Sequence, residues 1–243
     1  RKKDGEIIHH HSGVAGFAEY AVLPKEALVR IDKHIPFEHA ALFGCGVVTG
    51  VGAVINTASA REEDSIAIVG LGGVGLSALL ASIAIGSKKT IAIDLSNEKL
   101  NLAHELGADH ILNPNDANFL ERVRDLTSGG ANIAIETAGS GRALKTAYDI
   151  TRRGGTTVAA GMPGPKVDIT LSHLSIAAEE RIIKGSYMGS CIAHRDIPKY
   201  LDMFQTGKLP VDRLLSRKIT FEDLNAAMDR LDDAKTVREV LIP

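Results

Sequence analysis

The sequence is short of cysteine and tryptophan, and it carries no block of charge of one sign. Its 243 residues include two cysteines, too few for the disulfide framework of a small secreted domain, which favours a cytoplasmic location. The 28 Lys and Arg residues nearly balance the 30 Asp and Glu residues, and no run of like charge stands out beyond Arg1 to Lys3. The sequence therefore offers no basic face that could follow a phosphate backbone, and we expect no nucleic-acid partner.

A signal-peptide layout and an initiator methionine are also lacking. The chain opens at Arg1, so we expect part of the natural protein to lie upstream. One apolar stretch, residues 66–85, has the length of a membrane span, but glycines crowd its middle and would weaken a spanning helix. A strand, a turn and a helix suit this stretch better, and we expect no membrane association.

What the chain does have, from Ser65 onward, is a regular alternation of short β-branched runs and amphipathic stretches of helical length. This alternation is typical of repeated βαβ units, and it predicts an α/β fold with a doubly wound, six-stranded parallel sheet. Gly107 is expected to cap a helix, and Gly154 with Gly155 is expected to break the chain before the fifth strand. The expected strands are 65–70, 90–94, 110–113, 131–136, 156–161 and 181–187, and the expected helices are 76–85, 97–106, 117–126, 142–152 and 171–178.

The two ends of the chain do not follow this repeat. Residues 14–32 are expected to form two strands and a turn, and a short helix is expected from Phe37 to near Gly44. The ends are expected to form one second domain that is interrupted by the sheet domain. After the sheet we expect a helix at 194–204, a strand at 215–221, a helix at 222–231 and a final strand at 237–242.

Gly70, Gly72 and Gly75 have G-x-G-x-x-G spacing, directly after an expected strand and directly before an expected helix. The first glycine allows a tight turn, the second lets the backbone approach a pyrophosphate, and the third lets helix and strand pack closely. Free amides at the helix start, where Gly73 lies, would face the negative charge. The alternative is a glycine-rich turn without a ligand.

Asp94 ends the second expected strand, about 20 residues beyond the glycines, where an acid can accept a hydrogen bond from a ribose 2′-hydroxyl. A carboxylate at this position would repel a 2′-phosphate, so NAD is favoured over NADP. The alternative for Asp94 is a solvated acid at a strand end.

Cys45 lies between two glycines in the stretch FGCGVVTGVG, residues 43–52. A single cysteine among apolar residues is more often a small buried hydrophobe than a ligand. The residues next to Cys45 in the sequence favour a role as a metal ligand. GCGVVTGVGA, upstream of the dinucleotide turn, resembles the junction G-C-G-x-x-T-G-x-G-A of the zinc-dependent alcohol dehydrogenases in the medium-chain dehydrogenase/reductase family.

The resemblance extends over nearly the whole chain. GFAEYAVLP, GLGGVGLSA and ELGADHILNP look like successive segments of the family, and KTVREVLI looks like its closing strand. DLTSGGANIAIETAG matches the T-x-G-G-x-D-x-x-x-E segment except that Asn132 replaces the usual Asp. The resemblance implies an NAD-binding Rossmann domain at 47–188. It also implies that 1–46 and 189–243 are the remnant of a smaller, mainly β, GroES-like catalytic domain.

The resemblance also implies roles for single residues. Cys45 and Thr49 would be catalytic residues, with Cys45 as a ligand of the catalytic zinc. Thr49 and Val74 would lie against the nicotinamide. Asp94 and Lys99 would contact the adenosine ribose. The alternative for Lys99 is a solvated lysine on an exposed helix face. The remaining cofactor-binding residues are Arg238 at the pyrophosphate and, at the nicotinamide end, Ala160, Met162, Ser186 and Met188.

The other zinc-binding residues of the family, a cysteine and a histidine with an adjacent Glu, come from a segment that would lie before Arg1, as would a four-cysteine lobe for a structural zinc. Cys45 therefore looks like one zinc ligand without its companions. The tract His9 to His11 is not expected to replace them, because alternation along a strand separates His10 from the other two. His39 is expected to be exposed. Structural roles are expected for Cys191, His104, His110, His173 and His194.

The implied activity is interconversion of a primary or secondary alcohol with an aldehyde or ketone, with zinc as the Lewis acid and NAD as the hydride carrier. Two alternatives remain: a zinc-free reductase of the same superfamily, and, for these 243 residues alone, a non-catalytic NAD-binding module. The substrate would be a small-molecule alcohol or aldehyde. A homodimer or homotetramer is expected, because the sixth strand at a sheet edge would need a partner for its backbone groups.

Overall fold

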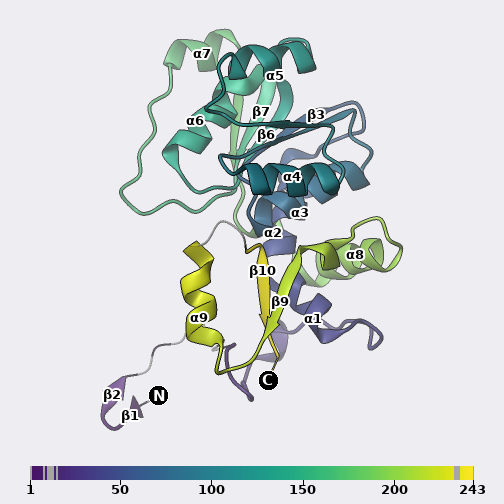
Figure 1. Ribbon diagram of the computed structural model, residues 1–243, viewed down its shortest axis with the longest axis vertical. Helices are drawn as coiled ribbons and strands as arrows, with labels where there is room; N and C mark the ends of the chain where they lie inside the picture. The colour runs from purple at the N-terminus through teal and green to yellow at the C-terminus, as the bar shows by residue number, and fades with distance from the viewer. Residues whose placement is uncertain (1, 8, 10–13, 15, 233–235, 243) are drawn as a thin grey trace.

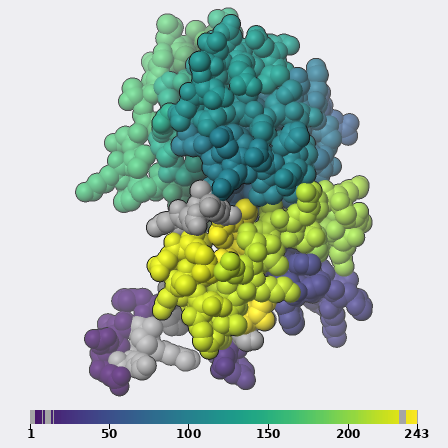
Figure 2. Space-filling model, viewed as in Figure 1, coloured from purple at the N-terminus to yellow at the C-terminus, as the bar shows by residue number. Residues whose placement is uncertain are grey.

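The computed structural model describes residues 2–7, 9, 14, 16–232 and 236–242. The parallel sheet and its helices form the upper part of the molecule in Figure 1, and elements from both chain ends form the lower part, with α2 (Gly46–Gly52) and α3 (Gly73–Ala84) between them. The space-filling view shows the same division, with the yellow and purple chain ends gathered below the teal and green sheet part (Figure 2).

Six parallel strands form the sheet in the order β5-β4-β3-β6-β7-β8. The two central neighbours, β3 and β6, follow one another in the sheet but not in the chain, so the direction of winding reverses between them. Ligands bind at such a switch point, beyond the carboxyl ends of the strands. The predicted doubly wound Rossmann sheet is confirmed. The strands are β3 (Ser65–Val69), β4 (Lys89–Ile93), β5 (His110–Leu112), β6 (Ala131–Glu136), β7 (Thr151–Ala159) and β8 (Ile182–Gly185).

Successive side chains of a strand point to opposite faces of the sheet, and around the central strand β3 both faces are buried. In β3, Ile66 and Ile68 belong to one apolar core, and Ala67 and Val69 belong to the other. The first core also holds side chains of α2, α3 and α4 (Asn97–Glu105), and the second holds those of α5 (Phe119–Thr127) and α6 (Gly141–Ile150). A further short helix, α7 (His173–Ala178), precedes β8.

α2 crosses α3 at close range, and glycine makes the crossing possible. A Cβ atom on Gly50 would lie 2.2 Å from the carbonyl oxygen of Val74 and 2.7 Å from the Cβ of Ser77. A Cβ on Gly52 would lie 2.2 Å from the carbonyl oxygen of Gly189. α2, continued by a π-helix at Ala53–Ala58, is thus fixed against both α3 and the segment after β8.

The lower part is built from short elements of both ends. β9 (Leu215–Ile219) pairs in parallel with β10 (Arg238–Leu241), and β1 (Lys2–Lys3) pairs with β2 (Glu6–Ile7) in an antiparallel pair. The expected strand at 215–221 and the expected final strand are confirmed. The assignment of these pieces to a GroES-like domain, with its boundaries at 46 and 189, stays a prediction. The helices of this part are α1 (Phe37–Ala40), which a 3-10 turn extends to Gly44, α8 (Ala193–Gln205) and α9 (Leu224–Asp229).

Two sequence-based expectations are wrong. In residues 14–32 the described part forms only a 3-10 turn, Lys25–Ala27, instead of two strands. A strand needs a neighbour for its backbone hydrogen bonds, and none of the described strands pairs with this stretch. Gly154 and Gly155 do not break the chain either. They lie inside β7, where Gly154 has a φ of +66° and the register with β6 shifts, which is the geometry of a bulge.

Gly107 follows α4 with a φ of +107°, and its amide donates to the carbonyl of His104, so the predicted helix cap is confirmed. The stretch 66–85 forms β3, the glycine-rich turn and α3, as expected. In the part of the chain that the structure describes, no single helix has the length and apolarity to cross a membrane. One pair of helical segments bent by 56°, Phe37–Gly44 with Gly46–Ala58, has them only when counted together.

Candidate functional site

The glycine-rich turn lies between β3 and α3, and each of its glycines meets a different constraint. Gly70 has a φ of +96°, and a Cβ on it would lie 2.8 Å from the Cβ of Ala138. A Cβ on Gly75 would lie 1.8 Å from the carbonyl oxygen of Gly70, so this glycine lets helix and turn pack. Gly72 faces open space, which leaves its backbone accessible to a ligand. The tight turn predicted at Gly70 and the close packing predicted at Gly75 agree with this distribution, and the pyrophosphate contact of Gly72 stays a prediction.

The first turn of α3 is open to an anion. Gly72 is the N-cap residue and has no side chain to cap the helix, and the first amides of a helix have no partner within it. Gly73 is buried and Val74 is half-buried at this end. The amides and the helix dipole together favour a negative group in front of the turn.

Asp94 lies at the mouth of the turn. One carboxylate oxygen accepts a hydrogen bond from the amide of Leu71 at 2.7 Å, and the other accepts one from the amide of Ser96 at 2.9 Å. The end of β4 is thereby tied to the turn after β3, and the half-buried Asp94 lines the cavity beside that turn. Lys99 is half-buried in the first turn of α4, where its amide donates to the hydroxyl of Ser96.

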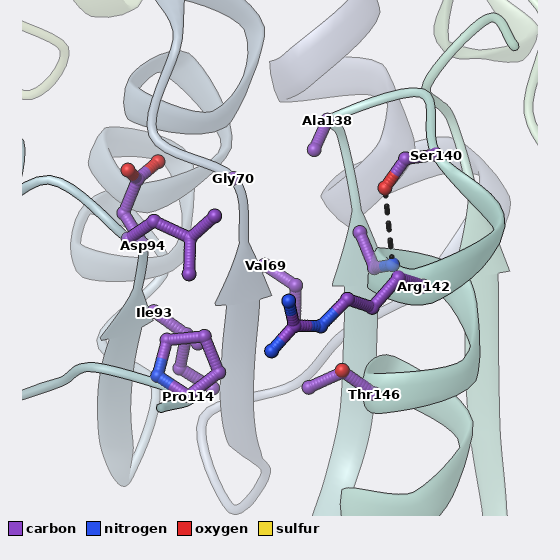
Figure 3. Close-up of a pocket in the computed structure, with 11 residues that line it drawn as sticks. Val69, Gly70, Ile93, Asp94, Pro114, Ala138, Ser140, Arg142 and Thr146 are labelled. Carbon is purple, nitrogen blue, oxygen red and sulfur yellow. Dashed lines mark hydrogen bonds between the residues drawn. The ribbon is translucent and has the colours of Figure 1, made fainter. Parts of the chain in front are cut away.

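A cavity of about 220 Å³ opens beside Asp94, at the switch point between β3 and β6 (Figure 3). Asp94 lies on one side of Gly70 in this view, and Arg142 lies on the other, where its guanidinium donates to the side-chain oxygen of Asn115 at 2.6 Å. Ser140 caps α6 by accepting from the amide of Ala143. The lining is mostly apolar: Val69, Gly70, Ile93, Asp94, Leu95, Pro114, Ala138, Ser140, Arg142, Ala143 and Thr146.

Sequence reasoning missed most of this cavity. Of its lining residues, local spacing predicts a role only for Gly70 and Asp94. Pro114 and Ala138 stand inside segments that carry the family resemblance, which was the available signal. No sequence signal marked Arg142, since a basic residue in the first turn of a helix is usually an exposed surface residue.

Arg238 reaches the turn from β10. A Cβ on Gly73 would lie 2.4 Å from its guanidinium carbon, and a Cβ on Gly46 would lie 2.4 Å from its Nη2 atom, so the guanidinium lies between the two glycines. Burial lowers the pKa of this guanidinium, and the neighbouring Cys45 offsets part of the effect. The hydrogen bonds and ion pairs within the described chain include none from the Arg238 guanidinium. A cation is thus held over the start of α3.

Cys45 is an exposed free thiol immediately before α2. It lines a hollow of about 410 Å³ together with residues of both chain ends, among them Phe17 and Arg238. Within residues 2–7, 9, 14, 16–232 and 236–242, no three His, Cys, Asp or Glu side chains come together in a way that could hold a metal ion. The described residues therefore offer a zinc ion one sulfur ligand at this point.

The residues expected at the nicotinamide end fall into two groups. Thr49 and Met188 lie together, with the Thr49 hydroxyl 3.9 Å from the Met188 sulfur and donating to the carbonyl of Cys45 at 2.8 Å. The buried Ser186 pairs its hydroxyl with Thr57 at 2.8 Å. Ala160 is buried directly after β7, whereas the Met162 side chain is 75% exposed.

The remaining histidines and the second cysteine show no ligand cluster in the described part of the chain. His10 and His11 lie outside the described residues. His39 is half-buried and packs edge-on against Phe204, with ring centroids 5.5 Å apart, so its expected exposure is wrong. Burial and the charge of Asp196 raise the pKa of Cys191 to about 11, as suits a thiol with a structural role.

Comparison with known proteins agrees with this geometry. A family model described as "Zinc-binding dehydrogenase" matches residues 73–206. The chain is 30% identical to S-(hydroxymethyl)glutathione dehydrogenase of Paracoccus denitrificans over 98% of its length and 66% of the relative. It is 34% identical to alcohol dehydrogenase-like 1 of Arabidopsis thaliana over 99% of its length and 63% of the relative.

Solved structures give the same result. The benzyl alcohol dehydrogenase of Acinetobacter calcoaceticus superposes with a TM-score of 0.90 at 31% identity, covering 94% of this chain and 63% of that one. An alcohol dehydrogenase zinc-binding domain protein of Burkholderia ambifaria gives 0.94 at 31% identity, covering 100% and 66%. The chain thus spans about two thirds of the length of these relatives.

Proposed function

The chain belongs to the family of zinc-binding dehydrogenases, which are oxidoreductases, and from this premise we propose that it is the NAD-binding portion of a zinc-dependent alcohol dehydrogenase. The whole protein would transfer hydride between a primary or secondary alcohol and NAD, giving an aldehyde or ketone. Two features of the glycine-rich turn together carry the proposal. The Asp94 carboxylate accepts a hydrogen bond from the Leu71 amide, and the Arg238 guanidinium lies over the start of α3.

The residues present fit the two halves of the cofactor. The apolar cavity beside Asp94 takes the adenine, and the Asp94 carboxylate accepts from the ribose hydroxyls with Lys99 as a second contact. The amides of Gly72, Gly73 and the following residues, together with the Arg238 guanidinium, hold the pyrophosphate. Thr49, Val74 and Met188 lie at the nicotinamide end, with Ala160, Met162 and Ser186 lining it through their backbone.

When bound, NAD supplies the hydride acceptor. The protein's part is to orient the ring and keep water from it. The half-buried Val74 limits the ring from the turn side, and the Thr49 hydroxyl is held in one position by the Cys45 carbonyl. The hollow lined by Cys45 is the space for the alcohol.

Zinc is a proposal for the whole protein. A catalytic zinc needs three protein ligands, and the described residues bring one, Cys45, to the hollow. We therefore assign no chemical step to zinc in this chain. By itself the chain is proposed to bind NAD(H) without oxidising alcohols. A zinc-free reductase remains the second candidate, since the sheet and turn would serve it equally.

The test uses the cofactor's own fluorescence, because the chain has no tryptophan. We expect the purified 243-residue chain to bind NADH with a Kd below about 1 mM, the range of ordinary cofactor and substrate sites. It should produce no NADH from NAD and alcohol. No binding up to about 1 mM NADH would contradict the proposal.

Metal analysis of the longer natural protein separates the two enzymatic candidates. The zinc-dependent enzyme should contain about one zinc per chain at this site, and Cys45→Ala should remove it together with the alcohol activity. A whole protein that holds no zinc at this site, and whose activity survives Cys45→Ala, would favour the zinc-free reductase.

We also propose a homodimer or homotetramer. β8 is at the sheet edge, and Ile182 and Ile183 on it are 46% and 41% exposed. An edge strand with apolar side chains invites pairing with a second copy. Sedimentation should show at least a dimer, and Ile183→Lys should shift it toward monomer while Leu231→Lys, an exposed position in the lower part, should not. A monomeric wild-type chain would contradict this.

A further inference from the structure

We infer that Glu136 and Thr137, at the carboxyl end of β6, are positioning residues that hold the glycine-rich turn in its binding shape without touching the cofactor. The inference rests on the proposed function, since it concerns the site assigned there to NAD. Neither residue lines the cavity beside Asp94. Both directly precede Ala138, which does line it.

Thr137 is bonded to the turn itself. Its hydroxyl donates to the carbonyl oxygen of Gly70 at 2.6 Å, and its amide donates to the carbonyl of Val69 at 2.9 Å. A Cβ on Gly75 would lie 2.7 Å from the same hydroxyl oxygen. One hydroxyl group thus occupies the point where the end of β3, the turn and the start of α3 meet.

The bond matters because of the conformation of Gly70. A φ of +96° is open to glycine and strained for other residues, so the peptide after Gly70 has more conformations available than a usual one. Fixing the Gly70 carbonyl removes that freedom. The amides that follow are the ones proposed to face the pyrophosphate.

Glu136 fixes the loop that carries Thr137. Its side chain is buried at 2% exposure, and one carboxylate oxygen accepts from the amide of Gly139 at 2.6 Å. Gly161, after β7, packs against the same oxygen, where a Cβ would lie 2.8 Å away. The Glu136 backbone carbonyl accepts from the amides of Ala160 and Gly161. The residue therefore ties together the loops that follow β6 and β7.

The two residues act through Ala138, which stands between them and the site. Ala138 lines the cavity, and its Cβ and amide set the close approach of Gly70. When Glu136 holds Gly139, which has a φ of +69°, and Thr137 holds Gly70, Ala138 is fixed from both sides. Burial raises the pKa of the Glu136 carboxyl, although neighbouring amides, Gly139 first among them, act in the opposite direction.

The test removes the Thr137 hydroxyl at constant shape. Thr137→Val should raise the Kd for NADH about tenfold and should speed amide hydrogen exchange in the segment 70–75. Thr137→Ser keeps the donor and should bind NADH within about twofold of wild type. Glu136→Met should weaken NADH binding as Thr137→Val does, while Glu136→Gln, which keeps an acceptor oxygen for Gly139, should restore most of the affinity.

Thr127→Val is the matched control. The Thr127 hydroxyl donates to the carbonyl of Val123 and accepts from the amide of Gly130, next to the amino end of the same strand β6. This variant should lower thermal stability as much as Thr137→Val without changing NADH affinity or exchange in 70–75.

The outcomes separate the inference from the proposed function. Wild-type affinity in Thr137→Val, or exchange in 70–75 no faster than in the control, would overturn the inference while leaving NAD binding in place. If the wild-type chain does not bind NADH, both the proposed NAD site and the inferred role of Glu136 and Thr137 in it are wrong. Exchange that is faster in Thr137→Val alone, with serine rescue of the affinity, would support the inference.

Discussion

Replacing Arg238 by alanine is expected to weaken NADH binding by about 10- to 100-fold without lowering the free energy of unfolding. The guanidinium lies against Gly73, at the start of α3, and against Gly46. A Cβ atom on either glycine would collide with it. A cation at this point adds a charge-assisted hydrogen bond to a pyrophosphate that already faces the amides of the turn.

The expected effect on stability has a separate reason. Burial lowers the pKa of Arg238, which means that its charge costs free energy in the empty site. Among the described residues no acidic partner would be left unpaired when this buried cation is removed. The stability lost with its packing contacts is offset by removal of the free-energy cost of burying the charge. We therefore expect the free energy of unfolding to stay within about 1 kcal/mol of wild type.

Arg230→Ala supplies the contrast. Arg230 makes a two-pronged ion pair with Glu239, whose side chain is 6% exposed, so removing it leaves a buried carboxylate unpaired. This variant should unfold more easily and bind NADH normally, the reverse of Arg238→Ala. NADH titration and urea unfolding of both variants test the pair of predictions. Unchanged NADH affinity in Arg238→Ala would remove Arg238 from the cofactor site.

The parts of the fold that the sequence predicted are those set by local chemistry. β-branched runs with helical stretches between them placed all six sheet strands, since this alternation is typical of βαβ units on a parallel sheet. The turn at Gly70 to Gly75 was predictable because three separate constraints each require glycine there. Asp94 followed from its distance along the chain to that turn.

The parts that were missed depend on residues far apart in the chain. Residues 14–32 have the composition of strands, but strand formation needs a neighbour, which no local pattern supplies. Glycines such as Gly154 predict a chain break as readily as a bulge within a strand, because the two have the same local signal. Arg142 and Thr137 gain their roles only where β6 is brought beside β3, and their spacing to Gly70 has no local meaning.

Asp94→Asn is expected to raise the ratio of NADPH to NADH affinity by at least about tenfold, and Asp94→Ala to weaken NADH binding by about 30- to 100-fold. The carboxylate accepts from the amides of Leu71 and Ser96, so alanine loosens the turn as well as removing the ribose contact. Asparagine removes the charge but keeps only one acceptor oxygen for the two amides, so the ratio of NADPH to NADH affinity, and not either affinity alone, reports the repulsion of a 2′-phosphate.

Titrating each variant with NADH and NADPH at two salt concentrations distinguishes these effects, because added salt screens the charge repulsion and leaves the hydrogen bonds nearly unchanged. The preference of the wild type for NADH should therefore shrink at high salt, and that of Asp94→Asn should not. An exposed acid of similar type, Asp212, gives the control variant Asp212→Asn, which should change neither affinity. If Asp94→Asn leaves the NADPH to NADH ratio as it was, the selection of NAD by this carboxylate is wrong, and the preference must come from elsewhere around the cavity.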